Sequence, residues 1–359
     1  MEAGSGAALA DALRCSWRSL PPVLDITEER LVALAPALLM NGEAGLVWRR
    51  LDATARKRLP SARVLREAYR FQALRAALRV REIAEAVRLL RSRGVEPLLI
   101  KGWAIARLYP DHGLRPPGDI DICVRADQLE TARGALRLAS VALAVDLHSG
   151  APAYGDRTVE ELFARSELVE VGGTEVRIPG APDHLRLLCL HLLSHGAWRP
   201  VWLCDVAAAI ETRAPEFRWE DCLDGNPRHT QAVACVIGLA QRLLGADLTG
   251  TPLSEGGAKL PRWLVPALLR QWEQGLGASG QGPLANRLTD LIRRPGGLRA
   301  ELRLRWRNPI QASFELGAPF NGWPRLPFQL VATLRRAPAF VRQVFSSAVA
   351  GTGRPLAGP

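Results

Sequence analysis

The fold is decided by two stretches of the chain, Pro97-Leu-Leu-Ile-Lys-Gly-Trp103 and Gly118-Asp-Ile-Asp-Ile-Cys-Val124. The first is a short apolar run that ends in a turn at Lys101, which predicts a buried strand running into a helix. The second alternates carboxylate and apolar side chains, which predicts another strand. Because alternate residues of a strand face the same side, its isoleucines would pack on the core, while Asp119 and Asp121 would point into one cleft.

A third carboxylate follows the same logic on a later strand. Asp146 lies in an expected strand over 141–148, on the same face as His148, which would bind phosphate or orient Asp146. If this strand lies beside the 119–124 strand, Asp146 completes a site of three carboxylates. The alternative is a set of surface carboxylates on a half-exposed sheet, but aspartate is depleted in strands. Such carboxylates can hold one Mg²⁺ or bridge two, with Mn²⁺ as the alternative ion.

Candidate phosphate-binding groups stand between the first two strands. Gly102, at a strand-to-helix junction, allows a phosphate to approach the free N–H groups of the helix start, and Lys101 adds a positive charge. Arg115 lies in a stiff loop rich in proline and glycine, from which it could reach the same phosphates. The alternatives are an ordinary strand-to-helix turn and a loop arginine in water. The carboxylates nearby favour the phosphate site for Lys101 and Gly102.

Further polar residues lie in apolar helices after these strands. His191 and His195 are one turn apart on an expected helix and share a face, but Leu192 stands where zinc proteases need a glutamate. The two histidines would lie behind the metal ligands or at the acceptor, or would be packed side chains with ordinary hydrogen bonds. Asp205, in the next helix, could serve in the same way, and it needs a partner if it is buried, for which Arg199 is a candidate.

The order of elements predicts an α+β fold, with a small mixed sheet flanked by N- and C-terminal helical regions, and not a doubly wound sheet. Apolar residues recur every three or four positions over 61–93, which predicts a long helix. A hairpin over 168–178 completes the sheet. Four parts are expected: an N-terminal helical region, an α/β core, a helical region on the acceptor side, and a Gly-rich linker with a basic C-terminal segment. Their bounds are 1–95, 96–180, 181–275 and 276–359. The helices expected in the third part are 183–198, 200–212, 229–244 and 262–275.

Composition places the chain among globular proteins. It has 359 residues, of which 48% are hydrophobic and 23% charged, close to the globular average. No apolar run reaches the ~18 residues of a membrane span, and the N-terminus lacks a basic region followed by an apolar stretch. Six scattered cysteines without a CxxC pair indicate reduced thiols in a cytoplasmic protein. A zinc site that joins Cys189 and Cys204 to the two histidines would have a spacing that matches no standard pattern.

Positive charge gathers at the C-terminal end of the chain. The net charge is +11 overall, and from residue 291 onward there are eleven arginines, no lysine and two glutamates. Such a segment suggests an anionic partner, which would be RNA, an anionic lipid surface or an acidic protein. The alternative is arginine enrichment from a GC-rich genome, which the total of three lysines supports.

The candidate site residues lie in a pattern that resembles a known family. The stretch Leu99-Ile-Lys-Gly-Trp-Ala-Ile-Ala-Arg-Leu-Tyr-Pro110 and the Arg-x-x-x-Asp-x-Asp pattern that begins at Arg115 are similar to the uncharacterised nucleotidyltransferases. The later Asp-x-His strand, the paired histidines and Trp202-Leu-Cys-Asp205 fit as well. The resemblance covers about residues 60–212. It implies a polymerase-β-like nucleotidyltransferase core in which the metal ligands are Asp119, Asp121 and Asp146.

The resemblance implies Mg²⁺-dependent transfer of a nucleoside monophosphate from an NTP, with ATP favoured, to a hydroxyl or phosphate of an acceptor. A small-molecule acceptor is favoured over a protein or RNA because no RNA-binding motif is evident. One departure is Trp103, since many members of the wider superfamily have a serine after this glycine, whose hydroxyl contacts the nucleotide phosphate. This departure favours one alternative, an inactive nucleotide-binding scaffold with the same fold. Another alternative is a basic RNA- or membrane-associated module that acts through the C-terminal segment.

Overall fold

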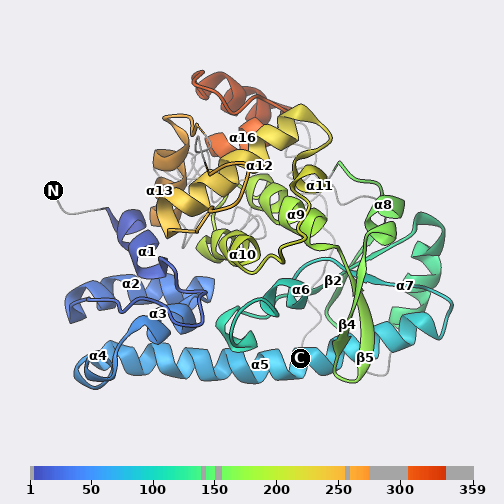
Figure 1. The fold of residues 1–359 in the computed structure, drawn as a ribbon, viewed down its shortest axis with the longest axis horizontal. Coiled ribbons are helices and arrows are strands. Elements are labelled where there is room, and N and C mark those ends of the chain that lie inside the picture. The colour runs from blue at the N-terminus through green and yellow to red at the C-terminus, as the bar shows by residue number, and fades with distance from the viewer. Residues whose placement is uncertain (1–3, 139–142, 150–155, 255–258, 275–305, 337–359) are drawn as a thin grey trace, which may run out of the picture.

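The computed structural model describes residues 4–138, 143–149, 156–254, 259–274 and 306–336 (Figure 1). Helices flank a five-stranded sheet whose strands follow the order β3-β2-β1-β5-β4. The sheet is mixed, because some neighbouring strands run parallel and others antiparallel, and the predicted α+β class is confirmed. The strands are β1 (Leu98–Leu99), β2 (Ile120–Val124), β3 (Val145–Ser149), β4 (Glu167–Val171) and β5 (Thr174–Ile178).

The register of the central strands aligns the predicted carboxylates. β3 runs parallel to β2 and places Asp146 opposite Asp121 and His148 opposite Cys123. The helix α7 (Leu129–Arg137) lies in the connection between them, because parallel neighbours need a crossover. On the other side of β2, β1 pairs antiparallel, and the N–H that follows it, on Ile100, donates to the carbonyl of Asp121 (3.0 Å). The carboxylates and the Lys101 turn are therefore carried by three adjacent strands.

The long helix α5 (Pro60–Arg91) packs against both the N-terminal helices and the sheet. Pro60 occupies its first turn, where a proline removes no helical hydrogen bond, and Gly94 follows its end with a φ of +73°. In Figure 1 α5 runs along one edge of the molecule, below the N-terminal helices at one end and the sheet at the other. The N-terminal helices are α1 (Ser5–Leu13), α2 (Glu28–Asn41), α3 (Ala44–Arg50) and α4 (Ala53–Arg58).

Each helix that the sequence predicts after the sheet is present, with ends shifted by a few residues. The first of them ends at Ser194 rather than at residue 198, because Gly196 and Ala197 adopt left-handed backbone (φ +70° and +58°). Pro200 then begins the next helix. The short helix expected over 158–166 is present as α8, whereas the sequence did not predict the short helices α11 and α16. The helices are α6 (Trp103–Ala106), α8 (Val159–Ala164), α9 (Ala181–Ser194), α10 (Pro200–Glu211), α11 (Trp219–Leu223), α12 (Pro227–Leu239), α13 (Leu264–Gln274) and α16 (Pro309–Glu315).

Part of the predicted C-terminal segment packs on the helical region. The side-chain amides of Asn308 and Gln311 donate to the carbonyls of Gly196 (3.1 Å) and Ser194 (2.9 Å), at the end of α9. These contacts dock α16 against α9. Residues 276–305, which include the predicted Gly-rich linker, lie outside the described residues, and so does the end of the chain from residue 337.

One large hydrophobic core joins the N-terminal helices to the helices after the sheet. Leu31 and Leu65 belong to the same buried cluster as Leu188, Val206 and Val236. A second cluster lies between the sheet, α5 and α7. All six cysteines are buried, and none of them forms a disulfide. Among the described residues no helix combines the length and the apolar character that crossing a membrane requires.

A buried carboxyl, Glu43, makes the stability of this core dependent on pH. Glu43 precedes α3, is fully buried, and accepts a hydrogen bond from the N–H of Val201 in the first turn of α10 (3.1 Å). Burial raises the pKa of Glu43 to about 8, although the charge of Arg199 acts against this, from an ordinary value of 4.5. Between these two values the unfolded chain releases a proton that the folded chain keeps. The corresponding stability is therefore fully present below pH 4.5 and is lost as the pH rises through 8.

We expect the free energy of unfolding to fall by about 1.4 kcal/mol per pH unit across this window. The variant Glu43→Gln, which stays neutral at every pH, is expected to lack that slope. Urea unfolding between pH 5 and 8 measures both curves, with Glu216→Gln, a change at an exposed loop glutamate, as the control. Parallel curves for wild type and Glu43→Gln would contradict the assignment.

Candidate functional site

The structure brings together three potential metal ligands on adjacent strands. The ligand atoms of Asp121 on β2 and of Asp146 and His148 on β3 all lie within 4.8 Å of one another. Nε2 of His148 lies 3.4 Å from Oδ1 of Asp121 and 3.3 Å from Oδ2 of Asp146, between the two carboxylates. The Asp146 strand lies beside the Asp121 strand, which is the condition that the sequence left open for Asp146 to join the site. The cluster offers two carboxylates and one imidazole at a single point of the sheet.

Lys101 supplies a positive charge to this cluster. Its Nζ lies 2.7 Å from Oδ1 of Asp121, and the two side chains are only 12% and 14% exposed. Burial alone would raise the pKa of Asp121, but the hydrogen bond with His148 and the charge of Lys101 outweigh it, so the pKa is lowered. Asp121 is therefore ionised at neutral pH, with an ammonium group and an imidazole beside it.

Asp119 is not a member of this group of ligand atoms. β2 begins at Ile120, one residue later than the sequence suggested, and Asp119 is exposed just before it. Asp119 lines a small pocket with Gly102, Trp103 and Arg115. Gly102 has a φ of +62°, and a Cβ on it would lie 3.2 Å from the carbonyl oxygen of Asp119, so this turn strongly favours glycine. Asp119 and Gly102 thus line one pocket, and their roles as a metal ligand and a phosphate-binding turn stay predictions.

Trp103 fills the side of this pocket that follows Gly102. Its indole packs edge-on against the ring of His112, with ring centroids 5.7 Å apart. Its Nε1 is buried and has no hydrogen-bond partner among the described residues. A large ring with an unused N–H donor therefore stands where the turn meets α6.

Arg115 and Asp205 form a buried ion pair. It connects the α/β core, which carries Arg115, with the helical region after it, which carries Asp205. Nε and Nη2 of Arg115 donate to the Asp205 carboxylate at 3.0 to 3.1 Å, and the hydroxyl of Tyr109 donates to Oδ1 at 2.8 Å. The Asp205 side chain is 0% exposed. Burial lowers the pKa of Arg115, but the charge of Asp205 and its hydrogen bonds outweigh this and raise it. Arg115 is thus not an arginine in water. Asp205 pairs with it and not with Arg199, which donates to the carbonyl of Asn41 (2.9 Å).

His191 and His195 form an aromatic group with Trp202. The ring centroids of the two histidines are 4.5 Å apart, and they lie 4.7 and 5.3 Å from that of Trp202. Burial, and then the charge of Lys101, lower the pKa of both imidazoles. The charge of Asp121 also acts on His195, which places this ring in the electrostatic range of the carboxylates. Both histidines are therefore neutral at neutral pH, and their place at the acceptor stays a prediction.

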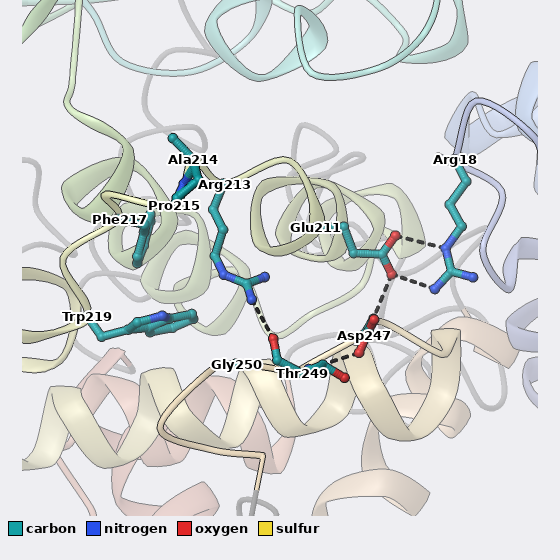
Figure 2. Close-up of a pocket in the computed structure, with 10 residues that line it drawn as sticks. All are labelled: Arg18, Glu211, Arg213, Ala214, Pro215, Phe217, Trp219, Asp247, Thr249 and Gly250. Carbon is teal, nitrogen blue, oxygen red and sulfur yellow. Dashed lines mark hydrogen bonds and ion pairs between the residues drawn. The ribbon is translucent and has the colours of Figure 1, made fainter.

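An open pocket in the helical region has its charges engaged in structural contacts (Figure 2). Glu211, at the end of α10, accepts two hydrogen bonds from Arg18 (2.8 and 2.7 Å) and one from the N–H of Asp247 (2.9 Å). Arg213 donates to the carbonyl of Thr249 (2.6 Å). These contacts hold the helix end to the loop over 245–250. None of the predicted site residues lines this pocket.

Sequence reasoning missed the partnership of Tyr109, Arg115 and Asp205. One signal pointed toward it, because an aspartate in an otherwise apolar helix needs a partner when it is buried. That signal does not identify the partner, since Arg115 and Asp205 are 90 positions apart. The ion pair between Lys101 and Asp121 was missed for the same reason, although both residues were predicted at the site.

Comparison with known proteins gives a family. A family model described as an uncharacterised nucleotidyltransferase matches the chain over residues 29–144 and 137–245. No curated protein and no solved structure matches the chain. The matched residues include β1, β2 and β3, and also Arg115 and Asp205, which form the buried ion pair.

Proposed function

The chain belongs to the uncharacterised nucleotidyltransferase family, whose model matches more than half of it, and on this premise we propose that it is a divalent-metal-dependent enzyme of nucleotidyl transfer. It would move a nucleoside monophosphate from an NTP, with ATP favoured, to a hydroxyl or phosphate of an acceptor. A small molecule is favoured as the acceptor. The observation that carries the proposal is the cluster of Asp121, Asp146 and His148 beside Lys101.

The donor set of the cluster fits a divalent ion. Carboxylate oxygens suit Mg²⁺ and Mn²⁺, and an imidazole nitrogen is tolerated by Mn²⁺. Asp121 and Asp146 would hold the ion, with His148 as a third donor or as a support for the carboxylates. Asp119 would contribute a further carboxylate from the neighbouring pocket. When bound, the ion would stabilise charge on the triphosphate and lower the pKa of the acceptor hydroxyl.

The protein side chains divide the remaining work. In the transfer, the acceptor oxygen forms a bond to the α-phosphorus, the bond between the α-phosphorus and the bridging oxygen breaks, and pyrophosphate leaves. Asp146 is 57% exposed and is available to take the proton of the acceptor. Lys101 and Gly102 would hold the phosphates. Arg115 uses Nε and Nη2 on Asp205, which leaves Nη1 for a phosphate in the pocket that it shares with Asp119.

A nucleotide-binding protein without transfer is the second candidate. It is favoured by Trp103, whose indole replaces a small hydroxyl side chain in this pocket. Turnover of the four NTPs with Mg²⁺ and Mn²⁺ in cell extract, followed by pyrophosphate release, separates the two. Binding with release supports the enzyme, and binding without release supports the scaffold. No binding of any NTP by the folded protein would exclude both. The six buried cysteines, none of which forms a disulfide, support the cytoplasm as the compartment.

Lys101 is expected to move from Asp121 to the phosphates when substrate arrives. Its Nζ contacts Oδ1 of Asp121, an oxygen that the ion also needs. The variant Lys101→Met is therefore expected to bind Mn²⁺ alone about 10-fold more tightly, because no ammonium group has to be displaced, and to bind the NTP at least about 10-fold more weakly. Electron paramagnetic resonance of Mn²⁺ and calorimetry of the NTP measure the two affinities.

Lys57→Met serves as the matched control, since Lys57 is exposed on α4. It is expected to change neither affinity. A Lys101→Met protein that bound both Mn²⁺ and the NTP more weakly would contradict this proposal. Lys101 would then stabilise the structure of the cluster and would not move from Asp121 to the phosphates.

A further inference from the structure

A groove of about 670 Å³ lies between the start of α13 and the segment that follows α16. Its walls include two tryptophans and three arginines, beside leucine and proline side chains: Arg262, Trp263, Arg270, Trp323 and Arg325. No aspartate or glutamate lines it among the described residues. In Figure 1 α13 and α16 lie away from the sheet, so the groove is separate from the carboxylate cluster. The groove is both aromatic and cationic.

The loop over 319–325 that forms one wall is fixed by a buried arginine. Arg325 is 5% exposed, and its guanidinium donates to the carbonyls of Trp323 (2.8 Å) and Pro319 (3.0 Å) and to Oδ1 of Asn321 (2.6 Å). The same guanidinium lies 4.8 Å from the ring centre of Trp263, whose Nε1 donates to the carbonyl of Asn321 (2.8 Å). This network ties the loop to itself and to Trp263, just before α13.

The loop and the residue that follows it expose two large apolar side chains to solvent. Trp323 is 66% exposed and Leu326 is 57% exposed, although burying an indole is strongly favourable. The side chains of Arg262 and Arg270 are exposed, and neither makes an ion pair or a hydrogen bond with the part of the chain that the structure describes. The groove therefore presents an exposed indole ring and two arginines that have no ionic or hydrogen-bond partner among the described residues.

We propose that this groove binds single-stranded nucleic acid, with a base stacked on Trp323 and phosphates held by Arg262 and Arg270. Every base has a flat face that stacks on an indole, and a basic groove tracks the phosphates, which is how proteins bind single strands without sequence preference. The charge of the groove excludes a second copy of the same face, because like charges would meet. A bilayer surface does not fit a recessed site. An acidic protein segment would satisfy the arginines, and the test below treats it as a separate outcome.

The test is binding of a short fluorescent poly(U) oligonucleotide to the full chain, measured by anisotropy across a range of salt concentrations. Trp323→Ala is expected to weaken binding about 10-fold by removing the stacking surface. The double variant Arg262→Ala/Arg270→Ala is expected to reduce the slope of log affinity against log salt by about 1.4, the value for two phosphate contacts on a single strand. This readout does not depend on turnover, so it stands or fails separately from nucleotidyl transfer.

Matched controls come from the exposed surface of α5. Phe71→Ala removes an aromatic ring that is 64% exposed, and Arg63→Ala/Arg66→Ala removes two exposed arginines. These variants are expected to bind as wild type does. Equal losses in the α5 and groove variants, or no loss at Trp323→Ala, would overturn the proposal. So would binding of a glutamate-rich peptide with aromatic residues in place of poly(U).

Discussion

The variant Asp121→Asn is expected to lose metal-dependent nucleotidyl transfer, with a rate at least about 10³-fold below that of wild type. Asp121 contacts Lys101 and His148 and lies opposite Asp146 in the register of β2 and β3. The amide keeps the size of the side chain but removes the negative charge that an ion and an ammonium group both require. Pyrophosphate release, and transfer of label from ATP labelled on its α-phosphate, measure the loss.

The control for this experiment is Asp127→Asn. Asp127 is an exposed aspartate just after β2 and belongs to no metal-ligand group among the described residues. It is expected to keep full activity. Mn²⁺ binding is expected to vanish in Asp121→Asn and to persist in Asp127→Asn. A fully active and folded Asp121→Asn protein would move the active site away from this cluster.

The variant Asp205→Ala is expected to lower the free energy of unfolding by about 3–5 kcal/mol, because it leaves the Arg115 guanidinium buried without its partner. Asp205 is fully buried and accepts hydrogen bonds from Arg115 and Tyr109. Removing it also leaves the Tyr109 hydroxyl without its acceptor. Urea unfolding measures the change in stability.

Two further variants separate this effect from a general sensitivity to mutation. Asp221→Ala breaks an ion pair with Arg218, whose side chain is 71% exposed, and is expected to cost less than about 1 kcal/mol. The double variant Arg115→Met/Asp205→Leu replaces both charges by apolar groups and is expected to recover most of the stability. If the double variant were as unstable as Asp205→Ala, packing at this point would dominate over the unpaired charge.

Local patterns in the sequence were sufficient to predict the elements that carry the site. The alternation of carboxylate and apolar residues predicted β2, and Val145-Asp-Leu-His148 predicted β3, because the period of a strand shows in a few residues. The spacing of apolar residues predicted α5 and the helices after the sheet. The adjacency of β2 and β3 was left open in the sequence, although a connection through one helix is typical of neighbouring parallel strands.

The pairings of side chains across the chain could not be predicted in this way. In the sequence, Arg115 could bind a phosphate, and Asp205 could bind a metal or pair with an arginine. Only the packing of α10 against the loop before β2 shows that the two residues pair with each other. The position of Asp119 depended on where β2 begins, and strand ends are the least certain part of any pattern. The groove with Trp323 depends on a loop conformation that Arg325 fixes through backbone carbonyls, which no periodicity reveals.

The core that the N-terminal helices share with the helices after the sheet has a consequence for how this chain can diversify. Leu31 and Leu65 pack with Leu188, Val206 and Val236, so a fragment that begins at β1 would leave a large apolar face open to water. The segment that carries the carboxylates therefore cannot be moved to another protein on its own. A fragment cut at its borders is expected to aggregate, because this apolar face would be exposed.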